Sequence, residues 1–227
     1  MSQTEPTHLT SDTALPELPV QEFLAALAAR TPAPGGGSMT ALTAALAAAQ
    51  LRMVIAYTRG KPKFSAFEHI LTDYDARLMR AGEILCELMQ EDKAAYEALN
   101  PFMKMPLAQR RADPRYSAVV TAAIGIPQAV GVTAAQIVEA ADILQDKVNK
   151  MLISDLGVAA GTAMAAVESA NFNVLVNLPL LEDTAAAKSI ALSLFELRQE
   201  SRRRYRLISE MLLNNLSDAF LHPADRS

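Results

Sequence analysis

The segment Pro34-Gly35-Gly36-Gly37-Ser38 leads directly into an apolar run over residues 39–58, and together they set the architecture of this chain. Proline and glycine interrupt a preceding helix, glycine adopts backbone conformations closed to other residues, and Ser38 can cap the helix that follows. The helix predicted over 39–58 is apolar on nearly every side, which is typical of the middle of a bundle or of a subunit interface. The sequence therefore predicts an all-α protein in which this helix is buried.

Further helices are expected on both sides of this run, because apolar residues recur there at helical spacing. Their predicted ranges are 20–30, 64–99, 117–144, 155–176 and 183–213. Pro101 and Pro106 are expected to close the second of these, and 110–114 to form a polar loop. No segment alternates apolar and polar residues over a useful length, so we expect no sheet. The predicted fold is an up-and-down helical bundle with a buried apolar central helix pair, 39–58 and 155–176.

The chain of 227 residues is long enough for one large domain with a substantial core. We expect this domain to cover residues 19–215. Residues 1–18 are dominated by Thr, Ser, Pro and Glu, and such a composition predicts a disordered arm. Residues 216–227 are expected to form a frayed C-terminal tail.

Charge and cysteine content exclude several classes of function. A formal net charge of −4 and a pI near 5.4 leave no overall basic field to attract nucleic acid. The single Cys86 suits a reducing compartment. The first 19 residues lack the features of a signal peptide, and no stretch reaches about 20 uninterrupted apolar residues, the length of a membrane span. We therefore expect a cytoplasmic protein with no nucleic-acid or membrane partner.

Asp92 is the most informative acidic residue. It shares a helix face with Leu88 and Tyr96, so its carboxylate points where the apolar residues point. A carboxylate that faces a helical core is costly unless it is paired. Two interpretations carry equal weight: a functional acid, or an internal ion pair or cap for a neighbouring helix.

Two other helix starts carry polar groups. The free N–H groups at the start of the helix that follows Gly37 can bind an anion or a polar ligand edge, or the glycines can act as a hinge. Ser154 and Asp155 precede the second apolar helix, and for each of them alone a helix cap is the better explanation than a functional role. Asn173 and Asn177 share a face near the end of that helix, which indicates a polar network or ligand contacts. No cluster of His, Cys and carboxylates has metal-ligand spacing, so no metal is expected.

Taken together, these motifs resemble the cyclodeaminase domain of the formiminotransferase-cyclodeaminase family, which also occurs alone as bacterial methenyltetrahydrofolate cyclohydrolase. The resemblance covers roughly residues 20–215. The segments that carry it are Pro32-Ala33-Pro34-Gly35-Gly36-Gly37-Ser38, Thr58-Arg59-Gly60-Lys61, Glu91-Asp92-Lys93-Ala94-Ala95-Tyr96, Met105-Pro106, Ile153-Ser154-Asp155-Leu156-Gly157-Val158-Ala159 and Phe172-Asn173-Val174-Leu175-Val176-Asn177. The glycine motif and the Ser-Asp-x-Gly-Val-Ala motif are specific in combination.

The resemblance implies a homodimeric helical bundle that binds a reduced folate, with one or more glutamates in its tail, and holds no permanent cofactor. The reaction would hydrolyse 5,10-methenyltetrahydrofolate to 10-formyltetrahydrofolate, or release ammonia from 5-formiminotetrahydrofolate to give the methenyl form. Because no formiminotransferase domain accompanies the sequence, we expect the hydrolysis. The family's catalytic acid falls on Asp92. The expected substrate-binding residues are Pro34, Gly35, Gly36, Gly37, Ser38, Lys61, Tyr96, Ser154, Asp155 and Asn173.

Two departures from the family pattern keep other functions open. Pro62 interrupts a run that is usually rich in lysine, and Leu107 stands where a lysine usually follows Leu-Pro. One alternative is a non-catalytic folate-binding or interaction protein that kept the bundle. The other is a paralogue that acts on a different amidine.

Overall fold

A computed structural model describes residues 13–221 of the chain, and its ordered elements are helices without exception in that range. In chain order these are η1 (Leu15–Glu17), α1 (Val20–Ala28), α2 (Gly36–Ala56), η2 (Pro62–Phe67), α3 (Glu68–Met103), α4 (Leu107–Ala112), α5 (Tyr116–Leu144), η3 (Lys150–Leu152), α6 (Ile153–Leu175), η4 (Leu178–Leu180) and α7 (Thr184–Leu221). The prediction of an all-α fold without a sheet is confirmed.

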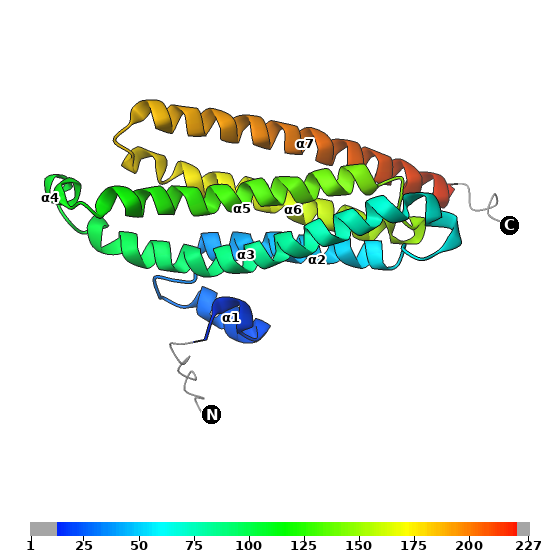
Figure 1. The fold of residues 1–227 in the computed structure, drawn as a ribbon, viewed down its shortest axis with the longest axis horizontal. Helices are drawn as coiled ribbons and strands as arrows, with labels where there is room; N and C mark the ends of the chain where they lie inside the picture. The colour runs from blue at the N-terminus through cyan, green and yellow to red at the C-terminus, as the bar shows by residue number, and fades with distance from the viewer. Residues whose placement is uncertain (1–12, 222–227) are drawn as a thin grey trace, which may run out of the picture.

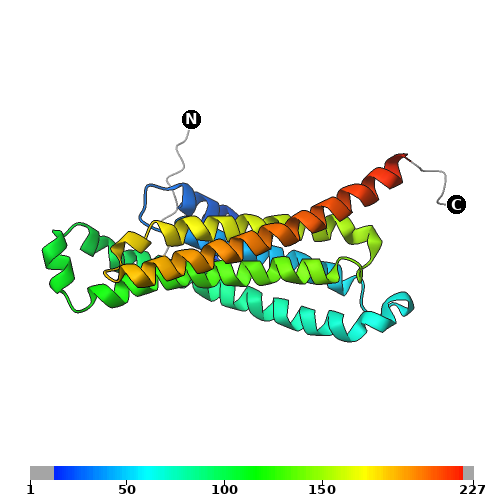
Figure 2. The same cartoon turned by 90° about the horizontal axis from the view of Figure 1, so that it is seen from above.

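Four long helices, α2, α3, α5 and α6, form the bundle, and α7 lies along α5 and α6. Figure 1 shows α3 and α5 in front of α2 and α6, and Figure 2, seen from above, shows the same two layers. The short helix α1 projects from the bundle and buries only Phe23 and Ala26 among its own residues.

Small side chains allow the bundle helices to pack closely. Fully buried alanines occur on all three apolar helices, among them Ala44 on α2, Ala141 on α5 and Ala163 on α6. On α5, Gly131 approaches α6 so closely that a Cβ there would lie 3.1 Å from the Cβ of Ala170. The predicted central pair, α2 and α6, is in contact along the bundle, and its apolar residues belong to the main core.

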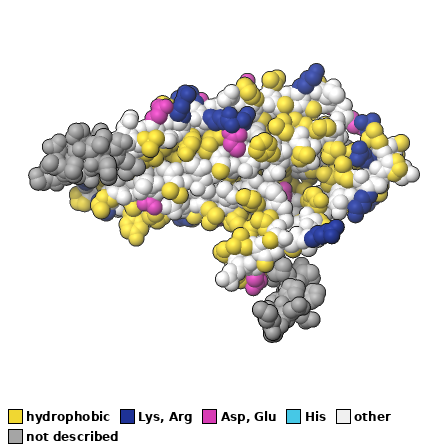
Figure 3. Space-filling model, turned by 180° about the vertical axis from the view of Figure 1, so that it is seen from behind, with side chains coloured by type: hydrophobic (Ala, Val, Ile, Leu, Met, Phe, Trp, Pro, Cys, Tyr) yellow, Lys and Arg dark blue, Asp and Glu magenta, His cyan; other side chains and the backbone are white. Residues whose placement is uncertain are grey.

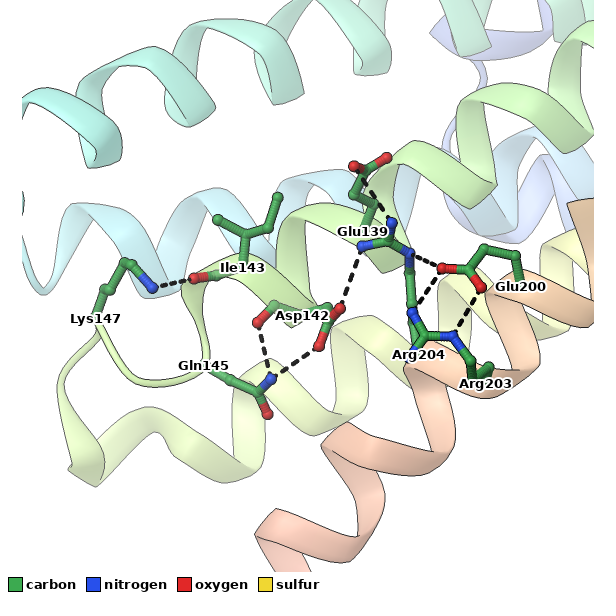
Figure 4. A network of polar contacts seen from close by, with 8 residues as sticks. All are labelled: Glu139, Asp142, Ile143, Gln145, Lys147, Glu200, Arg203 and Arg204. Atoms are coloured by element: carbon green, nitrogen blue, oxygen red, sulfur yellow. Dashed lines mark hydrogen bonds and ion pairs between the residues drawn. The ribbon is translucent and has the colours of Figure 1, made fainter.

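Ion pairs fasten α7 to the bundle. Figure 4 shows Arg204 between Glu200 of its own helix and two acids of α5, with a distance of 3.2 Å from Nη1 to Asp142 Oδ2. On the α6 side, Glu168 accepts hydrogen bonds from Arg198 and from Arg202. The arginines of α7 are thus paired with acids of this chain, and the absence of a nucleic-acid partner stays a prediction.

Several helix boundaries differ from the prediction. Helix α2 begins at Gly36, so two of the three glycines form its first turn and Gly35 is the N-cap residue. Ser38 is therefore inside the helix, and its predicted capping role is wrong. Pro101 lies within the last turn of α3, where helix formation continues to Met103. Part of the expected polar loop at 110–114 is the short helix α4.

Helical structure extends beyond both predicted ends of the domain, residues 19 and 215. Leu15 was expected in a disordered arm, but it is buried, and its backbone N–H donates to Gln90 Oε1 at 3.0 Å. At the other end α7 continues through Leu221, past the limit of 215 where a frayed tail was predicted. Residues 1–12 and 222–227, which were assigned to the arm and the tail, lie outside the described residues.

Helices α2 and α5 and the segment 150–180 are long and apolar enough to cross a membrane, judged by length and composition alone. The sequence prediction considered uninterrupted apolar runs and so did not identify them. In the fold these helices pack against one another, and a helix in the middle of a bundle is apolar around most of its circumference for that reason. The absence of a membrane partner stays a prediction.

Candidate functional site

A cleft of about 420 Å³ opens at the end of the bundle where α2 begins. Helix α3 contributes one wall, the start of α2 and the end of α6 contribute the second, and α5 closes the back. Its lining residues are Pro32, Ala33, Gly35, Gly36, Gly37, Asp92, Ala95, Tyr96, Leu99, Met103, Ala123, Pro127, Asn173, Val176, Asn177 and Leu180. Asp92 is the one carboxylate among them, and no Lys, Arg or His belongs to the lining.

Asp92 on α3 lies directly against the first turn of α2. A Cβ built on Gly37 would overlap the Asp92 carboxylate, with Oδ1 as the nearest atom. The residue at position 37 must therefore be glycine if the carboxylate is to keep this place. Here the glycine serves a close approach between two helices, since its backbone is helical and no positive φ is involved.

Ser38 holds the same carboxylate from behind. Its side chain is 0% exposed, and its Oγ lies 3.1 Å from Asp92 Oδ2 and 3.0 Å from the backbone carbonyl oxygen of Met89. The backbone N–H of Ser38 also donates to Asp92. Asp92 thus satisfies an N–H group of the first turn of α2, which otherwise lacks a side-chain cap. The interpretation of Asp92 as a cap for a neighbouring helix is therefore confirmed. Its interpretation as a functional acid stays a prediction, for a carboxylate that also lines the cleft.

Burial raises the pKa of the Asp92 carboxyl above its ordinary value, and the hydrogen bonds from Ser38 oppose this effect without cancelling it. No ion pair connects Asp92 with any described basic side chain, so the carboxylate has no cationic partner. An acid whose pKa is raised in a cleft is a candidate for proton transfer.

Amide groups form the polar wall opposite Asp92. Asn173 Nδ2 donates to Thr40 Oγ1 at 3.3 Å, and that hydroxyl donates to the carbonyl oxygen of Gly36 at 2.6 Å. Asn177 Nδ2 donates to the carbonyl oxygen of Ala123 at 2.9 Å and to that of Asn173 at 3.1 Å. These bonds fix the two amides in orientation and connect the end of α6 with the start of α2.

The structure brings together most of the residues predicted to form the site. Asp92, Tyr96, Asn173 and the glycines 35–37 all line the cleft. Pro34 is buried next to them, joined to Ala33 by a cis peptide bond. Ser38 is absent from the lining because it is completely buried behind Asp92, so its prediction as a substrate contact needs correction.

Lys61, Ser154 and Asp155 are at the opposite end of the bundle. Helix α2 separates Lys61 from the cleft by about 30 Å, because its 21 residues rise 1.5 Å each. Helices α2 and α6 are antiparallel, so the start of α6 lies beside the end of α2: Gln50 Nε2 donates to Asp155 Oδ1 at 2.9 Å. Within one chain these three residues do not line the cleft, and their role as substrate contacts stays a prediction.

The sequence analysis missed the apolar part of the lining. Leu99, Met103, Ala123, Pro127 and Leu180 face the cleft, but nothing in a helical pattern separates them from core residues. Asn177 lines the cleft beside Asn173, in agreement with the sequence pattern that places the two amides on one helix face.

Arg110 is the second residue with an unusual environment. Its Nε is buried without a hydrogen-bond partner, its Nη1 lies 3.5 Å from Sδ of the cleft residue Met103, and its guanidinium lies over the Tyr116 ring. The described residues contain no group of three His, Cys, Asp or Glu side chains that could hold a metal ion. The expectation that no metal takes part stays a prediction.

Comparisons with known proteins identify relatives of the whole bundle. The sequence model of the formiminotransferase-cyclodeaminase family matches residues 19–194. Pig formimidoyltransferase-cyclodeaminase is 30% identical over 198 residues, which cover 86% of this chain and 37% of that protein. The chain therefore spans little more than a third of the length of that relative. The methenyltetrahydrofolate cyclohydrolase of Methylorubrum extorquens is 30% identical over 173 residues, 74% of this chain and 83% of that protein.

One solved structure has the same fold. The crystal structure of formiminotetrahydrofolate cyclodeaminase from Thermotoga maritima superposes with a TM-score of 0.82 at 25% sequence identity. The match covers 89% of this chain and 99% of that one.

The raised pKa of Asp92 predicts a pH-dependent effect of the Asp92→Asn substitution on stability. At low pH the carboxyl is protonated in both folded and unfolded states, whereas above its folded pKa the folded protein must bury a charge. The stability of Asp92→Asn relative to wild type should therefore rise as the pH increases from about 3.8 through the folded pKa. Urea denaturation of both proteins across pH 3–8 measures the difference. A difference that does not vary with pH would contradict burial as the dominant influence, and Glu91→Gln, an exposed change on α3, controls for loss of negative charge.

Proposed function

Since the chain belongs to the formiminotransferase-cyclodeaminase family, we propose that it is a folate one-carbon enzyme that opens or closes the one-carbon bridge between N5 and N10 of tetrahydrofolate. It would hydrolyse 5,10-methenyltetrahydrofolate to 10-formyltetrahydrofolate, or convert 5-formiminotetrahydrofolate and a proton to the methenyl form and ammonia. The names of its relatives support both reactions.

The observation that carries this proposal is the unpaired, half-buried carboxylate of Asp92 in a cleft without a cation. The methenyl bridge is a delocalised amidinium cation, and a carboxylate in a poorly solvated site stabilises such a charge far more strongly than it would in water. A lysine or arginine beside Asp92 would neutralise it and remove this advantage. The electrostatics of the cleft therefore suit a cationic bridge.

Hydrolysis requires one group that first accepts and then donates a proton. Water adds to the bridge carbon, a C–O bond forms, the C=N π electrons return to nitrogen, and Asp92 takes the proton from the water. The carboxylic acid then protonates N5, the C–N5 bond breaks, and the hydroxyl proton passes back to Asp92 as the formyl C=O forms. Release of that proton to solvent completes a balanced reaction and regenerates the carboxylate.

Deamination uses the same group. N10 attacks the formimino carbon while Asp92 moves the N10 proton to the imine nitrogen, which gives a tetrahedral carbon that bears NH₂. A proton from the carboxylic acid then lets ammonia leave, and the methenyl cation remains. Both reactions need Asp92 in its acid and its base form within one turnover, which a pKa raised toward neutrality favours.

The remaining lining suits the rest of a pterin. The free N–H groups of the first turn of α2 and the amides of Asn173 and Asn177 offer donors and acceptors to its polar edge. The ring of Tyr96 and the apolar walls can contact its faces. No permanent cofactor is needed for these steps.

We also propose that two copies of the chain pair through the outer side of α2 and α6. Met39 and Leu46 on α2, and Val158 and Phe172 on α6, are exposed, and each pair forms a stripe because its members are seven or fourteen residues apart. The charged residues of both helices all bind within the chain: Arg52 to Asp75, Asp155 to Gln50, and Glu168 to α7. Figure 3 shows hydrophobic side chains spread across the middle of this face.

An apolar face without free charges resembles a core cut in half, as in permanent homodimers. A cytoplasmic location, which rests on the single Cys86, and the absence of nucleic-acid and membrane partners remain parts of the proposal.

The decisive assay follows the near-ultraviolet absorbance of 5,10-methenyltetrahydrofolate mixed with the purified protein. We expect accelerated decay that falls by about a thousandfold in Asp92→Asn, because general acid–base catalysis contributes a factor of this order. If the methenyl form is stable, 5-formiminotetrahydrofolate is tested next, with appearance of the same absorbance as the signal. Binding of both folates without turnover of either would identify a non-catalytic folate-binding protein instead.

Gly37→Ala should reduce kcat by about 100-fold, because the added methyl displaces the Asp92 carboxylate and misplacement by about 1 Å has effects of this size. Gly82→Ala is the matched control, since a Cβ there meets nothing within 4 Å and alanine favours the helix by up to about 1 kcal/mol. It should keep full activity. Normal kinetics of Gly37→Ala would show that the position of the carboxylate is unimportant.

Phe172→Glu should convert the dimer to a monomer, since it places a charge at a side chain that is 70% exposed on the proposed interface. Leu192→Glu is the control: this side chain is 64% exposed on α7, outside that interface, and the dimer should persist. Light scattering coupled to size exclusion gives the mass of each. A monomeric wild type, or a Phe172→Glu dimer, would refute this interface.

A further inference from the structure

The buried hydroxyl of Ser38 has two oxygen neighbours but a single proton. Its Oγ lies 3.0 Å from the carbonyl oxygen of Met89 and 3.1 Å from Asp92 Oδ2. A serine hydroxyl donates one hydrogen bond at a time and can accept others. The protonation state of Asp92 therefore determines which of the two oxygens accepts the hydrogen bond from the Ser38 hydroxyl.

When Asp92 is ionised, its oxygens can only accept, so the Ser38 hydroxyl donates to Oδ2. When Asp92 carries a proton on Oδ2, the carboxyl O–H donates to Ser38 Oγ, and the serine proton turns to the Met89 carbonyl. Every polar atom is paired in both arrangements. The Met89 carbonyl loses little when the serine turns away, because it belongs to the hydrogen-bond ladder of α3.

We propose that Ser38 is a positioning residue whose hydroxyl turns with each change of protonation of Asp92 and holds the carboxyl in one place as acid and as base. Ser38 acts through Asp92 alone, because it is fully buried and does not line the cleft. The role of Ser38 in turnover rests on the proposed function, whereas the exchange of hydrogen bonds between Ser38 and Asp92 does not depend on it.

Among the described residues around Asp92, no other group could take this role. Helices α2, α5 and α6 bring no charged side chain to the cleft, and Tyr96 on α3 is the only other titratable residue in its lining. Gly37 has no side chain, and the backbone N–H of Ser38 is a donor in both protonation states. The hydroxyl is thus the one contact of Asp92 that can reverse its direction.

The reversal has a kinetic consequence. A buried carboxylic acid whose O–H had no acceptor would leave a polar hydrogen unsatisfied, and a carboxylate without the hydroxyl donor would lose a charge-assisted bond. Serine avoids both penalties without moving a heavy atom. The carboxyl can then keep one rotamer in both of its protonation states.

The test compares Ser38→Ala with Ser38→Thr, which keeps the hydroxyl. The titration of Asp92 is followed by NMR of the 13Cγ carboxyl signal, assigned by its absence in Asp92→Asn, and requires no substrate. We expect Ser38→Ala to raise the pKa of Asp92, because the ionised form loses a donor, and Ser38→Thr to leave it close to wild type. Thermal melts verify that each variant is folded. If threonine does not fit the buried site, the alanine titration decides alone.

In the methenyltetrahydrofolate assay, Ser38→Ala should lower kcat by about tenfold with little change in KM, and the acid limb of the pH profile should move to higher pH. An unchanged Asp92 titration in folded Ser38→Ala overturns the proposal. A shifted titration in a protein that turns over neither folate supports the hydrogen-bond exchange and refutes the proposed function, so the two failures are distinguishable.

Discussion

The contact between the Asp92 carboxylate and the first turn of α2 is the interaction on which the cleft depends. It joins α3 to α2 at the point where Gly37 leaves room, and it satisfies an N–H group that has no other side-chain cap. In this place the carboxylate forms no ion pair with a described basic side chain and is partly shielded from water. The hydrogen bonds from Ser38 explain why a carboxylate is tolerated inside an otherwise apolar bundle, since a buried charge is costly unless it is hydrogen-bonded.

The polar groups around this contact differ in how freely their hydrogen atoms can be reoriented. Backbone N–H groups of α2 are fixed donors, and the amides of Asn173 and Asn177 are held by bonds to Thr40 and Ala123. The hydroxyl of Ser38, by contrast, can turn between Asp92 and the Met89 carbonyl oxygen. A rigid site with one adjustable hydrogen bond needs little reorganisation when a proton moves, and preorganisation of this kind is the main source of electrostatic catalysis.

Sequence patterns predicted the helices well, because apolar periodicity and the composition of α2, α5 and α6 have few structural solutions other than a bundle. The inward direction of Asp92 also followed from counting residues along one helix. The start of α2 was wrong, since glycine inside a helical first turn is disfavoured by propensity and is retained here only by the tertiary contact with Asp92.

The positions of Lys61, Ser154 and Asp155 could not be predicted, because a motif has no location along the bundle until the directions of the helices are known. Because α2 and α6 are antiparallel, the residues that begin α6 lie beside the end of α2. Asn173, near the end of α6, lies beside the glycines at the start of α2. The apolar walls of the cleft were missed for a different reason. A leucine that faces a ligand and a leucine that faces another helix have the same sequence signature.

A Cβ at position 37 would overlap the acid at position 92, so the residues at these two positions are expected to depend on each other in an alignment of relatives. A lineage that gains a side chain at the first position must shorten or relocate the acid at the second, so the two sites are constrained to change as a pair. The residues at these two positions, read together, therefore separate relatives that keep the acid in this place from relatives that keep only the helical bundle.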